Sequence, residues 1–398
     1  MSSWPTKLLG QLITFQRGFD LPYRERRSGN VPIVTSAGFS DWHDTAVCEA
    51  PGVVTGRYGT IGELFYIDQD FWPLNTTLFV RDFKGNDPKF VFYALQRFDF
   101  VGFSGKSGVP GVNRNDLHAE SVCFPADVDE QKAIAGALSD MDALIEALWR
   151  LIAKKRDLRQ GAMQRLLTGQ TRLPGFTAPW QEKRLGDHVT FLKNGIHSRA
   201  QLTHDDPVRY LHYGDIHVSP DLCINVSNAD MPRLPWSEAL GLTRLQDGDI
   251  VFVDASEDLN GVGKSLEIVG AVGVEAVSGQ HTIAARFNKS VLADGFKRYL
   301  QVIPAFTAHL RRLAAGTKIY ATNRKHIASA QLQLPETEEQ FAIARVLSDM
   351  ELEILALEAR LNKTRALKQA MMQALLTGRV RLPIRSSAAL QPKETAHV

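Results

Sequence analysis

The 398-residue chain is long enough for two globular domains, and its content of 44% hydrophobic and 23% charged residues is typical of a folded protein. It has no run of 18 apolar residues and no apolar stretch behind its first residues, so we expect neither a membrane span nor a secretory signal. The three cysteines lie far apart, which fits a reducing cytoplasm. The formal net charge is only +2, so charge alone does not identify a nucleic-acid-binding protein.

An internal repeat organises the chain. Residues 131–174 align without gaps on residues 340–383, and 24 of these 44 positions are identical. The segments before the repeats also match, with an offset that grows from 176 at Trp4 and Trp180 to 210 further along. Such a growing offset is expected of two colinear homologous modules with insertions in the second.

The first module is predicted to span residues 1–125. Short apolar runs bounded by glycine or proline predict strands over Val31–Thr35, Gly52–Thr55 and Leu64–Ile67, and a helix is expected over Lys89–Gln96. The mixture of elements indicates an α+β module.

Residues 126–170 are predicted to form a long spacer helix. Apolar residues recur at spacings of four and three, which is the pattern of a coiled-coil seam. These residues are Ile134, Leu138, Met141, Ile145, Leu148 and Ile152. Lys155 and Arg159 occupy later seam positions, so packing there is looser or the partner is acidic. The 38 residues from 131 to 168 would span roughly 57 Å at about 1.5 Å per residue.

The second module is predicted over residues 171–335, with a strand in 248–253 and a helix in 295–302. A second spacer helix follows over residues 336–379, and the tail 380–398 carries no pattern and is expected to be disordered. The second helix repeats the seam with Ile343, Leu347, Met350, Ile354, Leu357 and Leu361.

Both helices carry end signals. Asp127 with Glu130, and Thr337 with Gln340, are predicted N-caps with capping-box partners. Gly169 and Gly378 stand where left-handed C-terminal caps belong.

The two stripes most simply pack on each other in an antiparallel pair, which would place the modules at opposite ends with pseudo-twofold symmetry. The predicted fold is therefore two homologous mixed α/β domains separated by two long antiparallel coiled-coil helices. The alternative is that each helix only completes the core of its own module.

Enzyme signatures are incomplete. The tripeptides at 105–107 and 263–265 read Gly-Lys-Ser, but the additional glycine that a phosphate-binding loop needs is replaced by Phe100 and Asp258. The Pro-Asp at 220–221 has no Asp/Glu-x-Lys after it, as a paired-carboxylate nuclease would require, and the chain has no Pro-Pro, as the catalytic loop of an adenine methyltransferase would require. The spacing of His212, Asp215 and His217 allows a metal, but alternating residues in a strand-and-turn stretch explain it as well.

The duplicated motifs resemble the specificity subunits of type I restriction–modification systems. Each module opens with Trp-x-x-Lys-x-Leu-Gly, and the first also contains Arg-Gly-Phe-Asp-Leu-Pro at 17–22. Each repeated segment begins with Pro…Glu-Gln and ends with Leu-Leu-Thr-Gly, at Pro125, 130–131 and 166–169 and again at Pro335, 339–340 and 375–378. The ordered, duplicated set covers nearly the whole chain.

The resemblance implies a subunit without an active site. Each domain would read one half of an asymmetric, bipartite target in double-stranded DNA, and the helices would fix the gap. Two methyltransferase subunits would bind S-adenosylmethionine and methylate adenine, and nuclease/translocase subunits that use Mg²⁺ and ATP would join them. The subunit itself would need no cofactor or metal.

Loop residues that could contact DNA are arginines, lysines and one tyrosine between predicted strands. The candidates are Arg24, Arg26, Arg27, Arg57, Lys106, Arg114, Arg199, Lys264, Lys318, Tyr320 and Arg324. Asn-Arg recurs at 113–114 and 323–324, which favours a contact with phosphates or a role in the local fold over base reading. The basic run 154–156 indicates either a solvated helix face or a contact with DNA or a methyltransferase.

Two other functions stay open from the sequence. One is a stand-alone DNA-modifying enzyme with a degenerate site, and the other is a coiled-coil scaffold that only joins other proteins.

Overall fold

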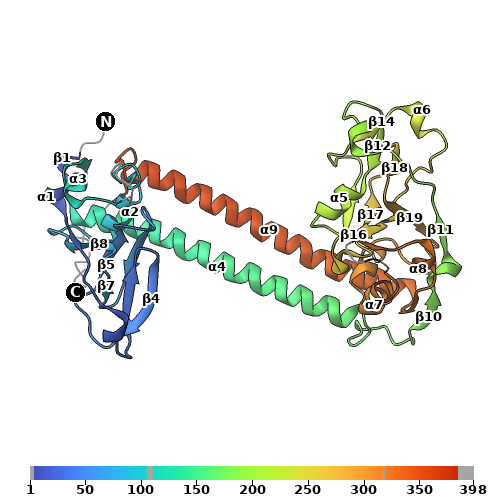
Figure 1. Ribbon diagram of the computed structural model, residues 1–398, viewed down its shortest axis with the longest axis horizontal. Coiled ribbons are helices and arrows are strands. Elements are labelled where there is room, and N and C mark those ends of the chain that lie inside the picture. Colours follow the sequence, from blue (N-terminus) through green and yellow to red (C-terminus); the bar gives the residue numbers. More distant parts are fainter. Residues whose placement is uncertain (1–3, 105–110, 315, 317–318, 384–398) are drawn as a thin grey trace, which may run out of the picture. The chain divides into compact units, whose positions relative to one another are not determined.

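The computed structural model describes residues 4–104, 111–314, 316 and 319–383 (Figure 1). The chain divides into two compact units. One comprises Met1–Leu151 and Leu357–Val398, and the other comprises Ile152–Ala356. Each unit contains one module and a stretch of each long helix, so the predicted class of two mixed modules joined by two long helices is confirmed.

The first unit contains short strands and helices followed by the beginning of a 39-residue helix, α4. The elements are β1 (Thr6–Leu8), α1 (Leu9–Leu12), β2 (Thr14–Arg17), η1 (Tyr23–Glu25), β3 (Val31–Thr35), β4 (Gly38–His43), β5 (Gly52–Gly56), β6 (Leu64–Ile67), β7 (Trp72–Pro73), β8 (Thr77–Asp82), α2 (Pro88–Leu95), α3 (Arg114–His118), β9 (Ser121–Cys123) and α4 (Val128–Leu166).

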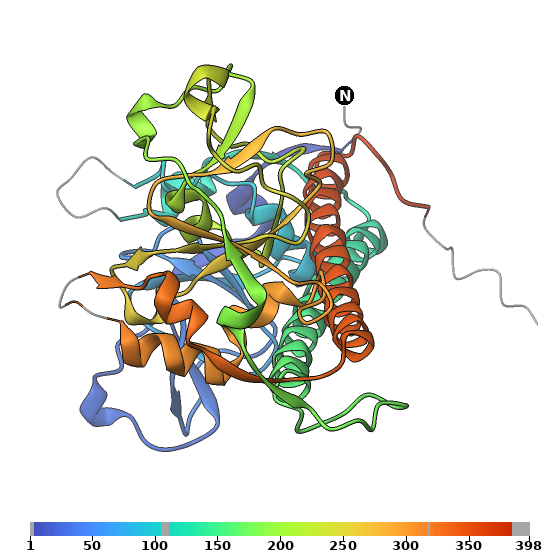
Figure 2. The same cartoon turned by 90° about the vertical axis from the view of Figure 1, so that its right-hand side faces the viewer.

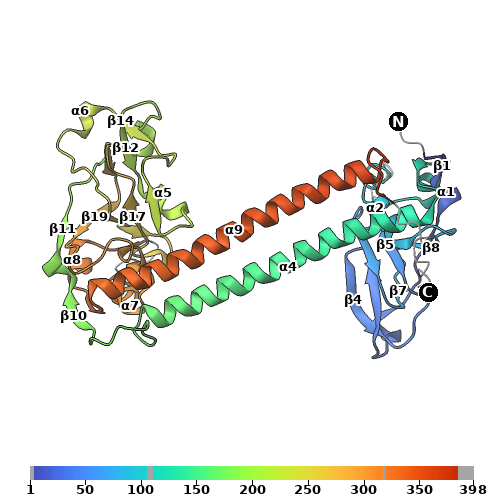
Figure 3. The same cartoon turned by 180° about the vertical axis from the view of Figure 1, so that it is seen from behind.

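The second unit has the same kinds of elements as the first and more of them (Figure 3). The elements after α4 are given in chain order. They are β10 (Gln181–Arg184), η2 (Leu185–His188), β11 (Val189–Phe191), η3 (Arg199–Gln201), β12 (Val208–Leu211), α5 (Tyr213–Val218), β13 (Cys223–Asn225), β14 (Arg233–Leu234), α6 (Trp236–Ala239), β15 (Ile250–Val253), β16 (Ala255–Ser256), η4 (Leu259–Gly261), β17 (Ser265–Val269), β18 (Ala276–Ser278), β19 (Thr282–Phe287), η5 (Lys297–Val302), α7 (Pro304–Leu313), β20 (Tyr320–Ala321), α8 (Arg324–Ala328), β21 (Gln331–Leu334) and α9 (Thr337–Leu375).

The two modules share one sheet topology. The main sheet has the order β2-β8-β5-β6 in the first module and β11-β19-β15-β17-β13 in the second. A smaller sheet has the order β4-β3-β7 in the first and β14-β12-β18 in the second, and in both its last pair is parallel. Strand β13 at the edge of the second main sheet has no counterpart in the first. Because order and direction agree for the other strands of these sheets, the modules are homologous, as the sequence repeat predicts.

Each hydrophobic core is closed by both long helices. In the first unit the beginning of α4 contributes Ile134 and Leu138, the end of α9 contributes Leu375, and Leu376 follows directly after it. In the second unit the end of α4 and the beginning of α9 contribute the equivalent residues. Within each unit the stretches of α4 and α9 therefore lie side by side and antiparallel (Figure 2). The alternative in which each helix completes only its own module is wrong.

Ion pairs between the helices explain the charged seam positions. In the second unit Lys155 Nζ lies 2.6 Å from Glu353 Oε1, and Arg159 Nη2 lies 3.0 Å from Glu351 Oε2. The acidic partner foreseen for these positions is therefore on α9. In the first unit the residue equivalent to Arg159 is Lys368, whose Nζ lies 2.5 Å from Asp142 Oδ1. The basic run 154–156 is thus in part a helix–helix contact, because Lys155 belongs to it.

An arginine closes the second unit where the chain leaves α4. The guanidinium of Arg172 makes two 2.6 Å hydrogen bonds to the carboxylate of Glu339, at the beginning of α9. The same guanidinium lies 5.8 Å from the ring of Trp180, whose Nε1–H also donates to Glu339. The Glu339 side chain is only 2% exposed, so its charge depends on these donors.

The first unit contains the same contact, made by Glu130 near the beginning of α4, Arg381 after α9, and Trp4. Arg381 binds Glu130 through two hydrogen bonds and lies 5.8 Å from the ring of Trp4. Glu130 is therefore not the capping-box partner of Asp127. Asp127 alone caps α4, by accepting the N–H of Asp129 at 2.9 Å.

Two glutamines attach the beginnings of the long helices to the modules. The Nε2 groups of Gln131 and Gln340 donate to the carbonyls of Pro125 and Pro335, both at 2.8 Å, and each Oε1 accepts a backbone N–H of the module. The predicted capping box is therefore wrong for the second helix as well, since Thr337 already lies inside α9. The predicted left-handed caps at residues 169 and 378 are confirmed, with φ of 71° and 66°.

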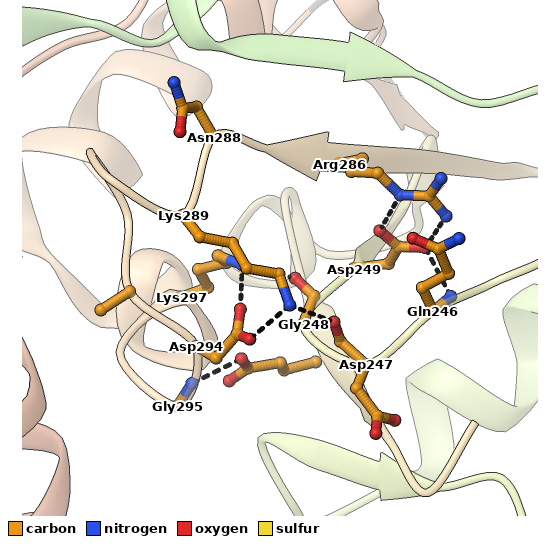
Figure 4. Close-up of polar contacts among 12 residues, drawn as sticks. Gln246, Asp247, Gly248, Asp249, Arg286, Asn288, Lys289, Asp294, Gly295 and Lys297 are labelled. Atoms are coloured by element: carbon orange, nitrogen blue, oxygen red, sulfur yellow. Dashed lines mark hydrogen bonds and ion pairs between the residues drawn. The ribbon is translucent and has the colours of Figure 1, made fainter. Parts of the chain in front are cut away.

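The second module contains an ionic network in which Lys297 and Asp249 are buried (Figure 4). Asp294 accepts hydrogen bonds from Lys289 Nζ at 2.7 Å and from Lys297 Nζ at 2.5 Å, and Lys297 is 1% exposed. Arg286 binds Asp249 through two bonds of 2.8 and 2.7 Å. Although burial raises the pKa of Asp294, the two lysines outweigh it and lower that pKa below its ordinary value.

The first module uses rings where the second uses charges. Glu267 and Arg298 form a buried ion pair of 3.1 Å in the second module. Strand pairing and the sequence offset place Tyr66 and Phe92 at these positions in the first, with ring centroids 5.7 Å apart. The same fold is thus stabilised by different interactions in the two modules.

The element at 297–302 differs in form from the sequence-based expectation, and the compact units divide the chain at other places than the predicted domains. The helix predicted over 295–302 is a 3-10 helix, η5, over Lys297–Val302, because Gly295, with φ of 82°, lies outside it. The predicted domain limits follow the sequence repeat, whereas the compact units divide within the long helices, so those limits stay a prediction. In the part of the chain that is described, no helix is long and apolar enough to cross a membrane.

Arg172→Met and Arg381→Met should each destabilise the protein. Each change leaves a buried glutamate without its guanidinium partner, so we expect the thermal midpoint to fall by about 5 °C or more in calorimetry. Arg345→Met is the control, because that side chain is 85% exposed and its nearest carboxylate is 3.9 Å away. Unfolding of Arg172→Met at the wild-type temperature would contradict the importance assigned to this contact.

Asp294→Asn should make the free energy of unfolding less dependent on pH in the acidic range. Since the pKa of Asp294 is lowered in the folded protein, its contribution is complete above the unfolded value of about 3.9 and is lost as pH falls through the folded value. The variant should be less stable than wild type at pH 7, and the difference should shrink below pH about 4. Urea unfolding between pH 3 and 7 measures this, and a difference that grows on acidification would refute it.

Candidate nucleic-acid interface

A one-turn 3-10 helix follows the first strand of the main sheet in each module. η1 follows β2 and η3 follows β11, at the same offset of 176 that relates Trp4 to Trp180. In both turns an N–H donates to the carbonyl three residues earlier at 2.9 Å. The arginine-bearing loops of the two modules therefore occupy equivalent places in the fold.

In the first module three arginines differ in how firmly they are held. The side chain of Arg24 is 85% exposed, and its ion-pair partner among the described residues is Glu25, at 3.6 Å. Arg26 is held more firmly, with its Nη1 3.3 Å from Asp41 Oδ2. The backbone N–H of Trp42 and then Arg26 hold the pKa of Asp41 below its ordinary value.

The third arginine of this loop, Arg27, has its Nε 2.9 Å from Asp44 Oδ2 and a side chain that is 69% exposed. Arg24 and Arg27 therefore present the accessible positive charge of this loop.

In the second module Arg199 lies against α5. Its Nη1 is 2.6 Å from Asp215 Oδ1, and Asp215 Oδ2 accepts the backbone N–H of His212 at 3.1 Å. The strand-and-turn expected here is a short helix, because His212 caps α5 by accepting the N–H of Gly214 at 3.2 Å. Burial, more than any charge nearby, lowers the pKa of His212.

The three residues with metal-ligand spacing serve the local fold. His212 and Asp215 cap α5, and His217 Nε2 lies 3.0 Å from the carbonyl of Ala255. Among the described residues no group of three His, Cys, Asp or Glu side chains is placed to hold a metal ion.

Lys264 contacts the same helix, and Tyr320 lies in a short strand pair. Lys264 Nζ donates to the carbonyl of His217 at 2.5 Å, and its Gly-Lys-Ser tripeptide leads into strand β17 and not into a helix, as a phosphate-binding loop would. Tyr320 pairs with Ser256 between strands β20 and β16. The structure thus brings Arg199 and Lys264 to α5, whereas Tyr320 lies on the neighbouring strand β20.

A hollow of about 420 Å³ opens beside these residues. It is lined by Tyr213, His217, Ala255, Ser256, Glu257, Asp258, His281 and Ile319. The rings of Tyr213 and His281 meet edge to face, with centroids 5.4 Å apart. His281 has a φ of 56°, a left-handed conformation that is rare outside glycine and is often found at binding sites.

Arg57 in the first module lies in the loop after β5. Its guanidinium stacks 4.6 Å from the centroid of the Tyr58 ring, and both side chains are half-buried. Among the described residues no carboxylate forms an ion pair with Arg57, so its hydrogen-bond donors remain available.

The repeated Asn-Arg pairs serve the fold at least in part. Asn113 and Asn323 are the N-caps of α3 and α8, where each side chain accepts backbone N–H groups. Arg324 donates to the carbonyl of Leu192 at 2.8 Å, whereas Arg114 is exposed. Two further candidates, Lys106 and Lys318, lie outside the described residues.

The comparisons with known proteins agree with this geometry. Residues 1–154 match the family model described as the type I restriction modification DNA specificity domain. The chain is 23% identical over 320 residues to the type I restriction enzyme MjaVIII specificity subunit of Methanocaldococcus jannaschii, which covers 74% of this chain and 71% of that protein.

Two solved structures share the fold. The S subunit of a type I restriction–modification system from M. genitalium matches with a TM-score of 0.60 and 15% identity, over 94% of this chain and 96% of that one. A chain from a structural study of complex assembly and conformational transition of the type I R-M system matches with a TM-score of 0.53 and 15% identity, over 95% and 98%. The chain has the fold and the motifs of a type I specificity subunit. The resemblance predicted from the sequence is confirmed.

Several residues of this specificity-subunit fold were missed by sequence reasoning. Tyr213, His281 and the carboxylates of Glu257 and Asp258 meet only in the folded second module. One signal was available, because the offset between the modules increases by four residues at this loop, which marks an insertion. The exposed rings of Phe39 and Trp42 on β4, with centroids 4.9 Å apart, left no such signal.

Arg24→Ala and Arg324→Ala should affect different properties of this protein. We expect Arg24→Ala to weaken DNA binding equally for all sequences and to reduce the salt slope by about one, with no change in stability. Arg324→Ala should lower the thermal midpoint, because it removes a bond to the module core. Affinity titrations at several salt concentrations and thermal unfolding measure both. Loss of stability in Arg24→Ala with unchanged affinity would be evidence against this assignment.

Proposed function

We propose that this chain is the DNA-reading subunit of a type I restriction–modification complex and has no active site of its own. The observation that carries the proposal is that one fold occurs twice in the chain, with an arginine-bearing loop at the same place each time. Two homologous but non-identical readers suit an asymmetric target of two half-sites. Arg24, Arg27 and Arg199 would contact DNA from these loops.

The long helices would set the gap between the half-sites. Each is 39 residues, or roughly 58 Å at about 1.5 Å per residue. Half-sites on one face of B-DNA lie about 34 Å apart, so helices of this length are sufficient as a spacer. The interhelical ion pairs of Lys155, Arg159 and Lys368 would resist sliding of one helix along the other.

Equivalent surfaces in the two units would recruit two methyltransferase subunits. Leu158 in the second unit and Leu367 in the first occupy the same repeat position, and they are 47% and 52% exposed. Exposed leucines at equivalent places are suited to two copies of one partner. A similar chain comes from a structure concerned with complex assembly of the type I system.

The proposal assigns the chemistry to the partners. The methyltransferase subunits would hold S-adenosylmethionine, and nuclease/translocase subunits would use Mg²⁺ and ATP. The net charge of +2 fits this division, because partners that close around the duplex would share the phosphate contacts.

The two alternatives predict different behaviour. A stand-alone modifying enzyme would methylate or cleave DNA as the pure chain, and the incomplete motifs of the sequence argue against it. A scaffold protein would assemble its partners without selecting a DNA sequence, and the repeated arginine loops argue against that.

Lengthening both helices should change the gap and leave the half-sites unchanged. The assembled complex, with its own methyltransferase subunits, is used to select duplexes from a random library. We expect wild type to select two fixed half-sites at one spacing. Seven residues inserted after Ala153 and after Asn362, which are equivalent positions, lengthen the pair by about 10 Å, or roughly three base pairs.

An insertion in only one helix is the matched control, since it shifts the ion pairs out of register and should destabilise the protein without giving a new spacing. An unchanged gap in the double insertion would remove the spacer function. If the wild-type complex selects no sequence, the proposed DNA-reading function is wrong. Methylation of DNA by the pure chain would favour the alternative of a stand-alone modifying enzyme.

A further inference from the structure

The loop after the central strand of the main sheet has the same backbone arrangement in both modules. The N–H of Arg57 donates to Thr76 at 2.8 Å, and the N–H of Asp254 donates to His281 at 3.1 Å. The carbonyls of Arg57 and Asp254 accept the N–H groups that precede the two Asn caps, at 2.9 and 2.7 Å. Arg57 and Asp254 are therefore equivalent positions.

The side chains on this shared backbone have opposite charge. The first module presents Arg57, stacked on Tyr58. In the second module Asp254 Oδ1 lies 3.3 Å from His281 Nδ1. The second loop is also longer, because Val262 lies eight positions after Asp254, whereas Ile61 lies four positions after Arg57.

The longer loop forms one wall of the 420 Å³ hollow. It contributes Glu257 and Asp258, and the N–H of Asp258 is held by Ser256 Oγ at 3.2 Å. The rings of Tyr213 and His281 also line the hollow. Glu257 is exposed, so its carboxylate lies at the rim and remains accessible.

A contact with phosphate cannot explain this difference. Both modules would meet the same anionic backbone, so a phosphate-binding position should be basic in both. Carboxylates would be repelled there. A base edge differs between half-sites, and the edge of cytosine presents an amino donor that a carboxylate can accept.

Resting on the proposed function, we propose that this loop reads one base in each half-site. Arg57 reads a guanine, and Glu257, at the rim of the hollow, reads a cytosine through its amino group. Arginine binds the O6 and N7 atoms of guanine with two hydrogen bonds, and Glu or Asp accepts from the N4 amino group of cytosine.

The stacking on Tyr58 makes Arg57 better suited to bases than the other arginines. The ring fixes the plane of the guanidinium, so less freedom is lost when two hydrogen bonds form. In contrast, Arg26, Arg27 and Arg199 each have a carboxylate within 3.3 Å.

Arg57→Gln and Glu257→Gln test the assignment in the assembled complex by selection from a random duplex library. In Arg57→Gln we expect guanine to be replaced by adenine at one position of one half-site, because glutamine pairs with adenine. The ratio of affinities for guanine and adenine at that position should change by about tenfold or more. In Glu257→Gln the preference for cytosine should fall at one position of the other half-site only.

Two matched variants complete the experiment. Arg24→Gln, the same substitution on an exposed arginine of the same module, should weaken binding to every sequence without changing any preferred base. Arg57→Lys keeps the charge and should reduce the preference for guanine without creating one for adenine. Thermal unfolding of each variant verifies that it is folded.

The outcomes separate the inference from the function on which it rests. A single altered position in the expected half-site supports the inference. If Arg57→Gln leaves the base preferences unchanged, or weakens binding to every sequence equally, Arg57 serves the fold or contacts phosphate. Either result would overturn the inference and leave the proposed DNA-reading function intact. If wild type selects no sequence, the proposed function fails first.

Discussion

The structure depends on a buried carboxylate at the beginning of each long helix and on the arginine that reaches it from the end of the other. Glu130 and Glu339 are each 2% exposed, and they would be costly to bury without Arg381 and Arg172. Because each arginine follows one helix and each glutamate begins the other, neither module is complete until both helices are in place. Folding of the two units is thereby coupled to pairing of the helices.

Around this shared junction the modules have diverged in physical character. The first packs Tyr66 against Phe92, whereas the second pairs Glu267 with Arg298. Sheet order and backbone hydrogen bonds are the same in both, so the fold tolerates a change from apolar to ionic contacts at these positions. The same tolerance at the loops allows Arg57 in one module and Asp254 in the other, as the proposed reading of two different half-sites would require.

The repeat, the long helices and most strands could be predicted because they depend on local periodicity and on identity between the two halves. Strands β3 and β6 begin and end as expected. The capping boxes were wrong because the side-chain oxygens of Glu130 and Gln340 accept hydrogen bonds from residues distant in the sequence, Arg381 and Ala293, and not from the local backbone. The hollow beside α5 could not be foreseen, because its walls come from segments up to about a hundred residues apart.

The placement of the junction residues has a consequence for how such a gene can change. The buried glutamate and the arginine that binds it recur at equivalent positions in both halves of the chain, and the repeated segments share 24 of 44 positions. A recombination event within either helix-coding segment would exchange an entire module, and the incoming module would find its junction partner already present. New combinations of the two modules could thus arise in one step, without any compensating change at the buried contact.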